Sequence, residues 1–261
     1  MPAYDAAAAS FDRHRAPPKG VPDRIRDAIL AAIRAPHPRL LDLGAGTGRI
    51  GAPFVAADDD YVAVDLSLAM LHRFAARFAA DDGPVPHLVQ ADGRALPFPD
   101  SSFDGVMLIQ VFGGLAEWRS LLAEVRRVLR TDGTLVIGRT STPPQGLDAR
   151  MKKQLAVILA AIGADHNATN PREEIERWLA DTAQGARQVP AAWDAIRTPR
   201  SFLDRHRTGA RFAALPEPAK QQALGKLAAW AVETFGSLDA ACSESHHFEL
   251  RIYRFDQPMD R

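Results

Sequence analysis

Short apolar runs alternate with amphipathic segments over the first half of the chain. Four runs have the length and composition of buried strands, and they cover residues 40–43, 61–65, 87–91 and 103–109. Between them, apolar residues recur every three or four positions around Ile25, Met70 and Leu121, which predicts helices with one apolar face. Strands of a parallel sheet are buried on both faces, so they contain continuous apolar runs. The alternation therefore predicts an α/β fold with a Rossmann-like, mostly parallel sheet.

The second half of the chain has longer helical patterns. A sheet core would need only a short helix after residue 140, so we interpret residues 141–245 as a largely helical insertion that forms a lid. Within it we expect an edge strand near 186–193, because Pro190 is tolerated only at the edge of a sheet. Residues 246–261 alternate apolar and polar positions, which predicts an antiparallel last strand. The expected sheet has seven strands, and residues 1–140 carry most of it.

Composition narrows the classes of function. The chain has 261 residues, a formal net charge of zero and a pI of about 7.1, so no overall field attracts it to nucleic acid or to an anionic membrane. We expect a small-molecule substrate. The single cysteine, Cys242, excludes an internal disulfide and a cysteine-rich metal cluster. No apolar run is long enough to span a bilayer, and we expect a cytoplasmic protein. The pattern does not predict an oligomeric state.

The main chemical signal is a glycine-rich turn after the first strand. Residues 44–51 place three glycines at alternate positions directly before a helical pattern. Glycine allows positive φ angles, and its bare backbone lets a ligand approach closely. The helix that follows favours an anionic or electron-rich group at its start. Residues 46–51 also match the G-x-G-x-x-G pattern of dinucleotide-binding proteins, so an oxidoreductase with a nucleotide cofactor remains an alternative.

Three aspartates end three successive strands. They are Asp42, Asp65 and Asp92. The carboxyl ends of parallel strands form one edge of a sheet, and ligands bind outside that edge, so we expect the three side chains to converge there. An acid roughly 20 residues past a glycine loop can accept hydrogen bonds from ribose hydroxyls, which is the role expected for Asp65. Asp92 could accept a hydrogen bond from an adenine amino group while the backbone at Gly93 approaches the ring.

These motifs resemble those of class I S-adenosylmethionine (SAM) dependent methyltransferases. Residues 40–51 resemble the family's first motif, whose glycine loop curls around the methionine half of the cofactor. Residues 92–104 resemble the Asp-Ala-x-x-Leu-Pro-Phe-x-Asp-x-x-Phe-Asp signature of the type 11 subgroup, with Gly93 in place of the alanine. Residues 4–12 resemble an N-terminal helix that folds over the cofactor. The matching region, 4–138, is about half of the chain, and it implies methyl transfer from SAM to a small molecule.

The resemblance also implies which residues bind the cofactor. They come from the N-terminal helix, the glycine loop and the strand ends, and they are Tyr4, Asp42, Gly44, Ala45, Gly46, Gly48, Asp65, Leu66, Asp92, Gly93 and Gln110. Many relatives have a histidine after the fourth strand, where this chain has Gly113 and Gly114. A SAM-binding domain without catalysis therefore remains a second alternative. Candidates for a general base are His14, His206 and Tyr4.

We expect no binding site at two other groups of side chains, a histidine pair and an arginine pair. His246 and His247 are neighbours in a predicted strand and point to opposite faces, so we expect no metal site there. Arg126 and Arg127 lie on the polar face of the helix around Leu121, and we expect both to be solvated rather than to bind phosphate.

Overall fold

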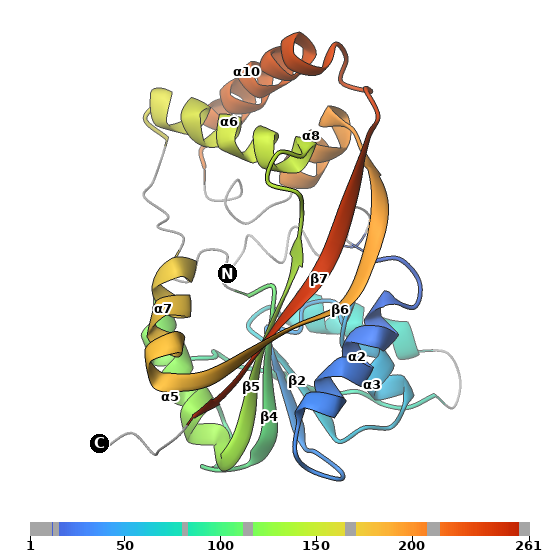
Figure 1. The fold of residues 1–261 in the computed structure, drawn as a ribbon, viewed down its shortest axis with the longest axis vertical. Helices are drawn as coiled ribbons and strands as arrows, with labels where there is room; N and C mark the ends of the chain where they lie inside the picture. The colour runs from blue at the N-terminus through green and yellow to red at the C-terminus, as the bar shows by residue number, and fades with distance from the viewer. Residues whose placement is uncertain are drawn as a thin grey trace.

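The computed structural model describes residues 12, 16–79, 83–111, 117–164, 171–207 and 215–255. Its centre is a seven-stranded sheet of β1 (Leu40–Leu43), β2 (Tyr61–Asp65), β3 (His87–Gln90), β4 (Phe103–Ile109), β5 (Leu129–Ser141), β6 (Ala183–Arg197) and β7 (Cys242–Phe255). The strand order is β3-β2-β1-β4-β5-β7-β6. Six strands run in one direction, and β7 is antiparallel to both of its neighbours (Figure 1). The predicted sheet with an antiparallel last strand is confirmed.

Helices cover both faces of the sheet (Figure 1). One core contains side chains from α2 (Val21–Ala32), α3 (Ala52–Ala56) and α4 (Leu68–Ala75), which a short 3-10 helix, η2 (Ala76–Phe78), follows. The opposite core contains side chains from α5 (Trp118–Val128) and α7 (Arg172–Thr182), where Trp118 stacks edge-on against Trp178. Ser67 caps α4 by accepting a hydrogen bond from the Met70 amide. The apolar spacing therefore predicted α2, α4 and α5 correctly.

Three further helices form a separate helical unit beyond the sheet. They are α6 (Leu147–Ala161), α8 (Pro199–Arg207) and α10 (Glu217–Phe235), and they share a core of their own. The ends of β6 and β7 extend up to this unit, which follows the carboxyl end of β5 (Figure 1). The expected edge strand is β6, and its register with β7 shifts between Gln188 and Ala191, around Pro190. The division of the chain at residues 140 and 245 stays a prediction, since α7 from the second segment packs on the sheet.

Arg127 differs from the solvated side chain that the sequence led us to expect. Its guanidinium donates hydrogen bonds to the carbonyls of Leu96 (3.0 Å) and Phe98 (2.7 Å), and it pairs with Glu124. Glu124 in turn accepts a hydrogen bond from the Leu96 amide at 2.7 Å. Charge-assisted bonds of this kind are stronger than neutral ones. Arg127 and Glu124 therefore fix the loop that follows Asp92. Their bonds hold the backbone of the Leu-Pro-Phe segment, residues 96–98, in one conformation.

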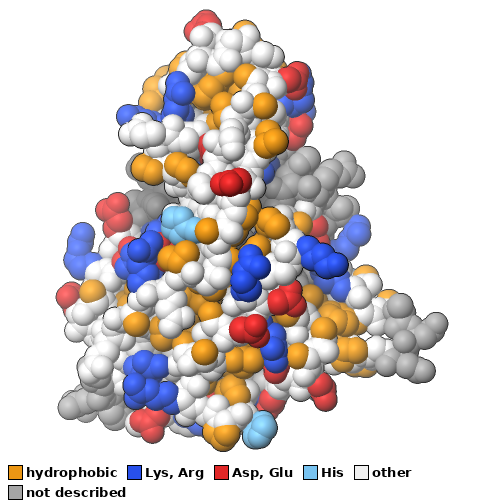
Figure 2. Space-filling view, turned by 45° about the vertical axis from the view of Figure 1, so that its right-hand side comes forward, with side chains coloured by type: hydrophobic (Ala, Val, Ile, Leu, Met, Phe, Trp, Pro, Cys, Tyr) orange, Lys and Arg blue, Asp and Glu red, His pale blue; other side chains and the backbone are white. Residues whose placement is uncertain are grey.

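The surface carries mixed charge. Basic and acidic side chains are interspersed over the face shown in Figure 2, as expected for a net charge of zero. Among the described residues, no helix combines the length and apolar character needed to cross a bilayer.

Candidate functional site

The glycine turn after β1 combines a packing requirement with an open backbone. Gly46 and Gly48 have φ angles of +58° and +74°, which are strained for residues with a side chain. A Cβ atom on Gly48 would lie 2.3 Å from the ring of Phe74, so the size of this residue is fixed by packing. A Cβ atom on Gly46 would meet none of the described residues within 4 Å. As far as those residues extend, the backbone at Gly46 faces space in which a ligand can lie.

Asp65 holds this turn in place. Its Oδ2 accepts a hydrogen bond from the Gly46 amide at 2.8 Å, and its Oδ1 accepts one from the Ser67 amide at 2.8 Å. A carboxylate has about four lone-pair sites, and the Gly46 and Ser67 amides each bond one of its two oxygens. Leu66, the next residue, is 43% exposed and offers an apolar surface beside this acceptor. Backbone amide, carboxylate and apolar surface are thus adjacent at the carboxyl ends of β1 and β2.

Asp42 is enclosed rather than exposed at the edge. It is only 2% exposed, and the Tyr61 hydroxyl donates a hydrogen bond to its Oδ2 at 2.5 Å. Its Oδ1 has no hydrogen-bond partner within the described parts of the chain. Burial raises the pKa of Asp42 to about 7, the bond from Tyr61 opposes this rise, and the negative charge of Asp65 adds to it. Asp42 is thus a buried acid paired with Tyr61, so its environment differs from that of Asp65, which bonds the turn.

Asp92 has a partner that the sequence reasoning missed. Arg94 donates to it from its backbone amide at 2.9 Å and from its guanidinium at 2.6 Å, and these bonds lower the pKa of Asp92. Only the two-residue spacing of opposite charges could have suggested this pair. Gly93 lies against a packed wall, because a Cβ atom there would be 2.8 Å from Leu121. Asp92 is therefore an ionised acceptor on a loop that packing and Arg127 hold in place.

Gln110 connects the end of β4 with its neighbours. Its φ is +61°, a conformation that is uncommon for a residue with a side chain and that concentrates at functional sites. Its amide donates to the Gly138 carbonyl at 2.8 Å, and its Nε2 donates to Thr140 Oγ1 at 3.0 Å. Its Oε1 accepts a hydrogen bond from Arg49 at 3.1 Å. Sequence reasoning predicted Gln110 but not Thr140 or Arg49, since only the folded sheet brings these residues together.

Several predicted positions lie outside the described residues. They are Tyr4, His14, Gly113 and Gly114. Asp12 is described, and it accepts a hydrogen bond from the Thr47 hydroxyl at 2.5 Å and pairs with Arg77. Asp12 is thus bonded to the glycine turn.

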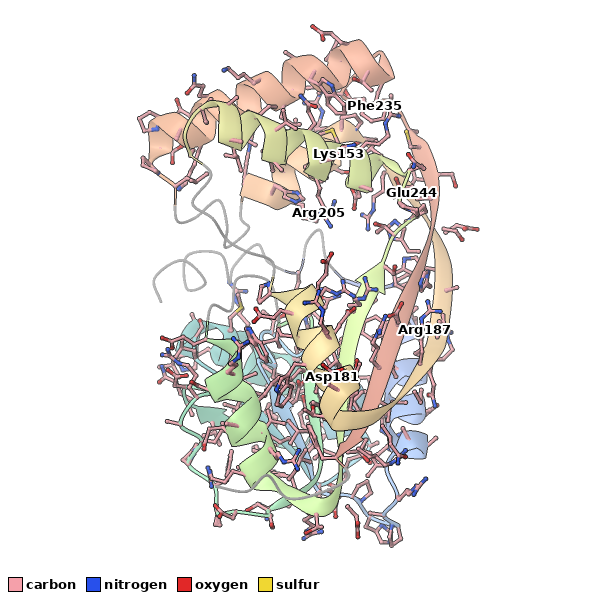
Figure 3. All side chains as sticks on the ribbon, turned by 60° about the vertical axis from the view of Figure 1, so that its left-hand side comes forward. Lys153, Asp181, Arg187, Arg205, Phe235 and Glu244 are labelled. Carbon is pink, nitrogen blue, oxygen red and sulfur yellow. The ribbon has the colours of Figure 1, made fainter. Side chains whose placement is uncertain are left out.

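His206 lies in the helical unit. Its Nδ1 is 2.9 Å from the Phe202 carbonyl, and its ring stacks on the Phe202 ring with centroids 3.7 Å apart. Burial is the main cause that lowers the pKa of His206 to about 4, so the ring is neutral at neutral pH. Its neighbour Arg205 pairs with the buried Asp148 of α6 at 2.6 Å (Figure 3). A histidine with so low a pKa is a weak base.

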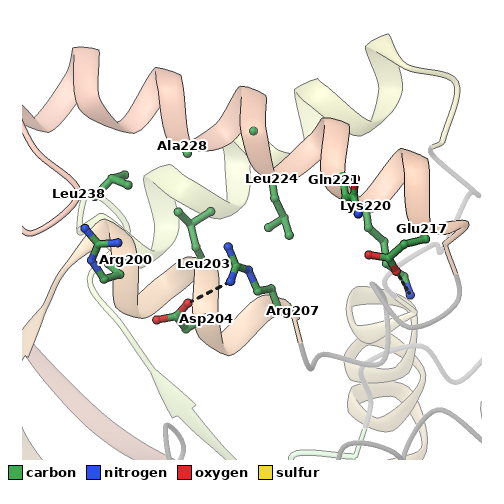
Figure 4. A pocket seen from close by; sticks show the side chains of 11 residues that line it. Arg200, Leu203, Asp204, Arg207, Glu217, Lys220, Gln221, Leu224, Ala228 and Leu238 are labelled. Carbon is green, nitrogen blue, oxygen red and sulfur yellow. Dashed lines mark ion pairs between the residues drawn. The ribbon is translucent and has the colours of Figure 1, made fainter.

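A pocket of about 670 Å³ lies between α8 and α10 (Figure 4). Leu203, Leu224 and Leu238 line it together with charged side chains such as Arg207, which pairs with Asp204 at 3.8 Å. None of its lining residues is one of the predicted cofactor-binding residues. Among the described residues, no group of three or more histidine, cysteine, aspartate or glutamate side chains could hold a metal ion.

The fold and the turn define a class of protein. The sheet order with an antiparallel β7, and the glycine turn joined to the acid that ends β2, are those of a class I methyltransferase fold. Residues 41–137 match a family described as "Methyltransferase domain". Together with the relatives below, this match shows that the chain belongs to the class I SAM-dependent methyltransferases, and SAM is its cofactor.

Named relatives support this membership. The chain is 36% identical over 159 residues to a demethylmenaquinone methyltransferase of Clavibacter sepedonicus, a match that covers 57% of this chain and 64% of the relative. It is 32% identical over 203 residues to a demethylmenaquinone methyltransferase of a Mycobacterium species (strain KMS), covering 74% of this chain and 85% of the relative.

Solved structures share the fold. The YcgJ protein of Bacillus subtilis matches with a TM-score of 0.57 and 18% identity, over 90% of this chain and 99% of that chain. The Haemonchus contortus phosphoethanolamine N-methyltransferase 2, solved in complex with SAM, matches with a TM-score of 0.52 and 17% identity, over 97% of this chain and 57% of that chain.

A matched pair of glycine variants tests whether the cofactor lies on Gly46. We expect Gly46→Ala to weaken SAM binding by about tenfold or more, because the added methyl group occupies the ligand's space. Gly163→Ala is the control, because Gly163 has a similar φ of +66° and likewise no described residue within 4 Å of an added Cβ atom, in the turn after α6. Both variants should lose about 1–2 kcal/mol of stability from the strained backbone. Calorimetric titration and thermal unfolding measure the two effects, and equal SAM affinity in both variants would contradict the placement.

Proposed function

We propose that this protein transfers a methyl group from SAM to a small-molecule acceptor, with the cofactor lying across the turn between Gly46 and Asp65. One observation carries the placement. None of the described residues comes within 4 Å of a Cβ atom placed on Gly46, and the Gly46 amide is bonded at 2.8 Å to the Asp65 carboxylate. A methionine chain fits against bare backbone, and ribose hydroxyls fit a carboxylate acceptor.

The remaining assignments follow from this position. The adenine would lie between the exposed Leu66 and the backbone at Gly93, with its amino group directed at Asp92. The methionine end would lie between the glycine turn and Gln110, whose unusual backbone is held by Gly138. These residues fit the group in kind, because together they offer a backbone surface, an apolar surface and carboxylates at two strand ends, and an adenine amino group would have to exchange with Arg94 at Asp92.

SAM supplies an activated methyl group on a sulfonium, and the protein mainly has to align an acceptor with it. Holding two reactants in line contributes about 7–11 kcal/mol to lowering a barrier. The helical unit follows β5 at the carboxyl edge of the sheet, where it can exclude water from such a site. A base is required only when the acceptor atom carries a proton. Of the candidate bases, His206 stays neutral and weakly basic, so we assign it no proton transfer.

The names of the relatives suggest an acceptor to test first. Two curated relatives are demethylmenaquinone methyltransferases. A quinol of that type is therefore the first acceptor that we propose, and the acceptor panel should extend to other small aromatic compounds.

Binding and turnover measurements test the proposed function in two steps. Calorimetric titrations should show binding of SAM and its demethylated product, S-adenosylhomocysteine, and no binding of NAD. Transfer of labelled methyl from SAM to a member of the panel should follow. Binding of NAD without SAM would overturn the proposal. SAM binding without transfer to any acceptor would instead support a cofactor-binding domain without catalysis.

A further inference from the structure

Three arginines from adjacent strands surround one buried glutamate. Glu249 of β7 is 3% exposed, and it pairs with Arg139 of β5 at 3.4 Å, with Arg187 of β6 at 3.0 Å and with Arg251 of β7 at 3.0 Å. Arg139 stands opposite Glu249 and Arg187 opposite Arg251 in the strand register, so all four side chains share one face of the sheet. We call these four residues, with Arg172 and Glu176, the arginine cluster.

The cluster has more positive than negative charge. On α7, which covers this face, Arg172 pairs with Glu176 at 2.7 Å, and Arg251 lies 3.9 Å from Glu176. Four arginines and two glutamates give a formal charge of +2. The arginines lower the pKa of Glu249 to about 2 against the effect of its burial, so this carboxylate is ionised. The pKa of Arg139 is lowered by burial and by repulsion from Arg172.

The hydrogen-bond donors of the cluster exceed its acceptors. Each guanidinium has five N–H donors, whereas one carboxylate offers about four lone-pair sites. Arg139 and Arg187 each direct a single nitrogen, Nη2, at Glu249. Their side chains are 32% and 57% exposed, so an incoming group can reach the other donors. An oxyanion bound here would offset the excess of positive charge in the cluster.

The cluster lies close to the proposed cofactor site. Arg139 directly follows Gly138, whose carbonyl accepts the Gln110 amide, and directly precedes Thr140, which accepts from the Gln110 side chain. Successive strand residues are about 3.4 Å apart and point to opposite faces, so the cluster begins at the same edge of the sheet as Gln110, on the face opposite to the Thr140 side chain. In Figure 3, Arg187 lies on the strand pair below the helical unit that carries Arg205. The region between sheet and helical unit is where we expect an acceptor to enter.

We infer that the arginine cluster binds an oxyanion, a carboxylate or a phosphate, carried by the methyl acceptor. The inference rests on the proposed function, and within its acceptor panel it favours acidic small aromatic compounds over the quinol, with the acid group held by the guanidiniums of Arg139, Arg187 and Arg251. Planar guanidinium groups match both oxyanions through paired hydrogen bonds. Two sources of the shared chemistry, a carboxylic acid and a phosphate ester, are distinguished by the probes below.

Binding of simple anions to the full-length protein tests this inference. Benzoate represents the carboxylate and inorganic phosphate the phosphate group, and each is titrated calorimetrically into protein saturated with S-adenosylhomocysteine. We expect one of the two to bind, and Arg187→Gln to weaken that binding by about tenfold, since a charge-assisted hydrogen bond is lost. Arg130→Gln is the matched control. Like Arg187, Arg130 is half-exposed and pairs with a mostly buried carboxylate, Asp104, but it lies at the start of β5, at the opposite end of that strand from Arg139.

The outcomes separate this inference from the proposed function. If neither anion binds to the wild-type protein, or if Arg187→Gln and Arg130→Gln bind it equally well, the anion site is refuted. Thermal unfolding of both variants verifies that they are folded, and Arg139→Gln provides a second substitution if Arg187→Gln is not. Failure of the proposed function would appear earlier and separately, as no binding of S-adenosylhomocysteine to the wild-type protein.

Discussion

Replacing Asp42 with asparagine is expected to raise the free energy of unfolding at pH 8 by about 2 kcal/mol. Asp42 is 2% exposed, and its pKa is raised from 3.8 to about 7, which corresponds to roughly 4 kcal/mol of charge-burial cost at alkaline pH. The asparagine oxygen can still accept the bond from Tyr61, whereas its buried amide costs about 1–3 kcal/mol for lack of a partner. The difference between these two effects gives the expected gain.

The sign of the pH dependence follows from proton linkage. Below pH 3.8 the Asp42 carboxyl is protonated in both the folded and the unfolded state, so no charge is buried on folding and the free energy of unfolding carries no charge-burial penalty. Between pH 3.8 and about 7 the unfolded state releases the proton more readily, so stability falls as pH rises. The stability of Asp42→Asn relative to wild type should therefore increase by about 4 kcal/mol from pH 4 to pH 8.

Urea unfolding of the wild type and the variant across this pH range measures the difference directly. Other titrating groups, such as His206, affect both proteins and cancel in the comparison. Asp132→Asn makes the same chemical change at an exposed position near the start of β5 and serves as the control. If the difference in stability between Asp42→Asn and the wild type stays constant from pH 4 to pH 8, the pKa of Asp42 is not raised in the folded protein.

Asp65→Ala is expected to weaken SAM binding by roughly 10- to 100-fold. The substitution leaves ribose hydroxyls without their acceptor, at about 1–3 kcal/mol. It also removes the carboxylate that anchors the Gly46 and Ser67 amides, so the turn loses part of its support. Calorimetric titration of SAM measures the combined effect. Asp132→Ala, at the opposite end of the sheet, should leave the affinity unchanged.

A ligand lacking a ribose hydroxyl separates the two roles of Asp65. We expect 3′-deoxy-S-adenosylhomocysteine to bind the wild type more weakly than S-adenosylhomocysteine does, and to lose less affinity on Asp65→Ala. The coupling between the ligand change and the protein change reports the direct contact, as in a double-mutant cycle. If Asp65→Ala weakens both ligands by the same factor, Asp65 acts only on the turn.

Local pattern predicted most of the sheet, because its buried strands and its glycine turn are specified by short segments. The run ending at Asp42, the edge position of Pro190 and the antiparallel last strand all follow from burial and hydrogen-bonding rules that act within a few residues. The placement of Asp65 next to the glycine turn could also be expected, since adjacent parallel strands end at one edge.

Contacts between distant segments could not be predicted in the same way. Arg127 has the spacing of a solvated helix residue, yet the folded chain brings the carbonyls of residues 96 and 98 to its guanidinium. The sequence predicts Tyr61 only as a strand residue. The pairing of β1 with β2 brings its hydroxyl within hydrogen-bond distance of Asp42. The arginine cluster combines β5, β6, β7 and α7, so its charge excess is invisible until the sheet is assembled.

A crystal structure with S-adenosylhomocysteine tests the central claim most directly. The account predicts the ribose hydroxyls within hydrogen-bond distance of the Asp65 carboxylate and the amino-acid end of the ligand against the Gly46 backbone. A ligand bound in the pocket between α8 and α10, or one that leaves Gly46 uncovered and Asp65 without a ribose contact, would contradict it.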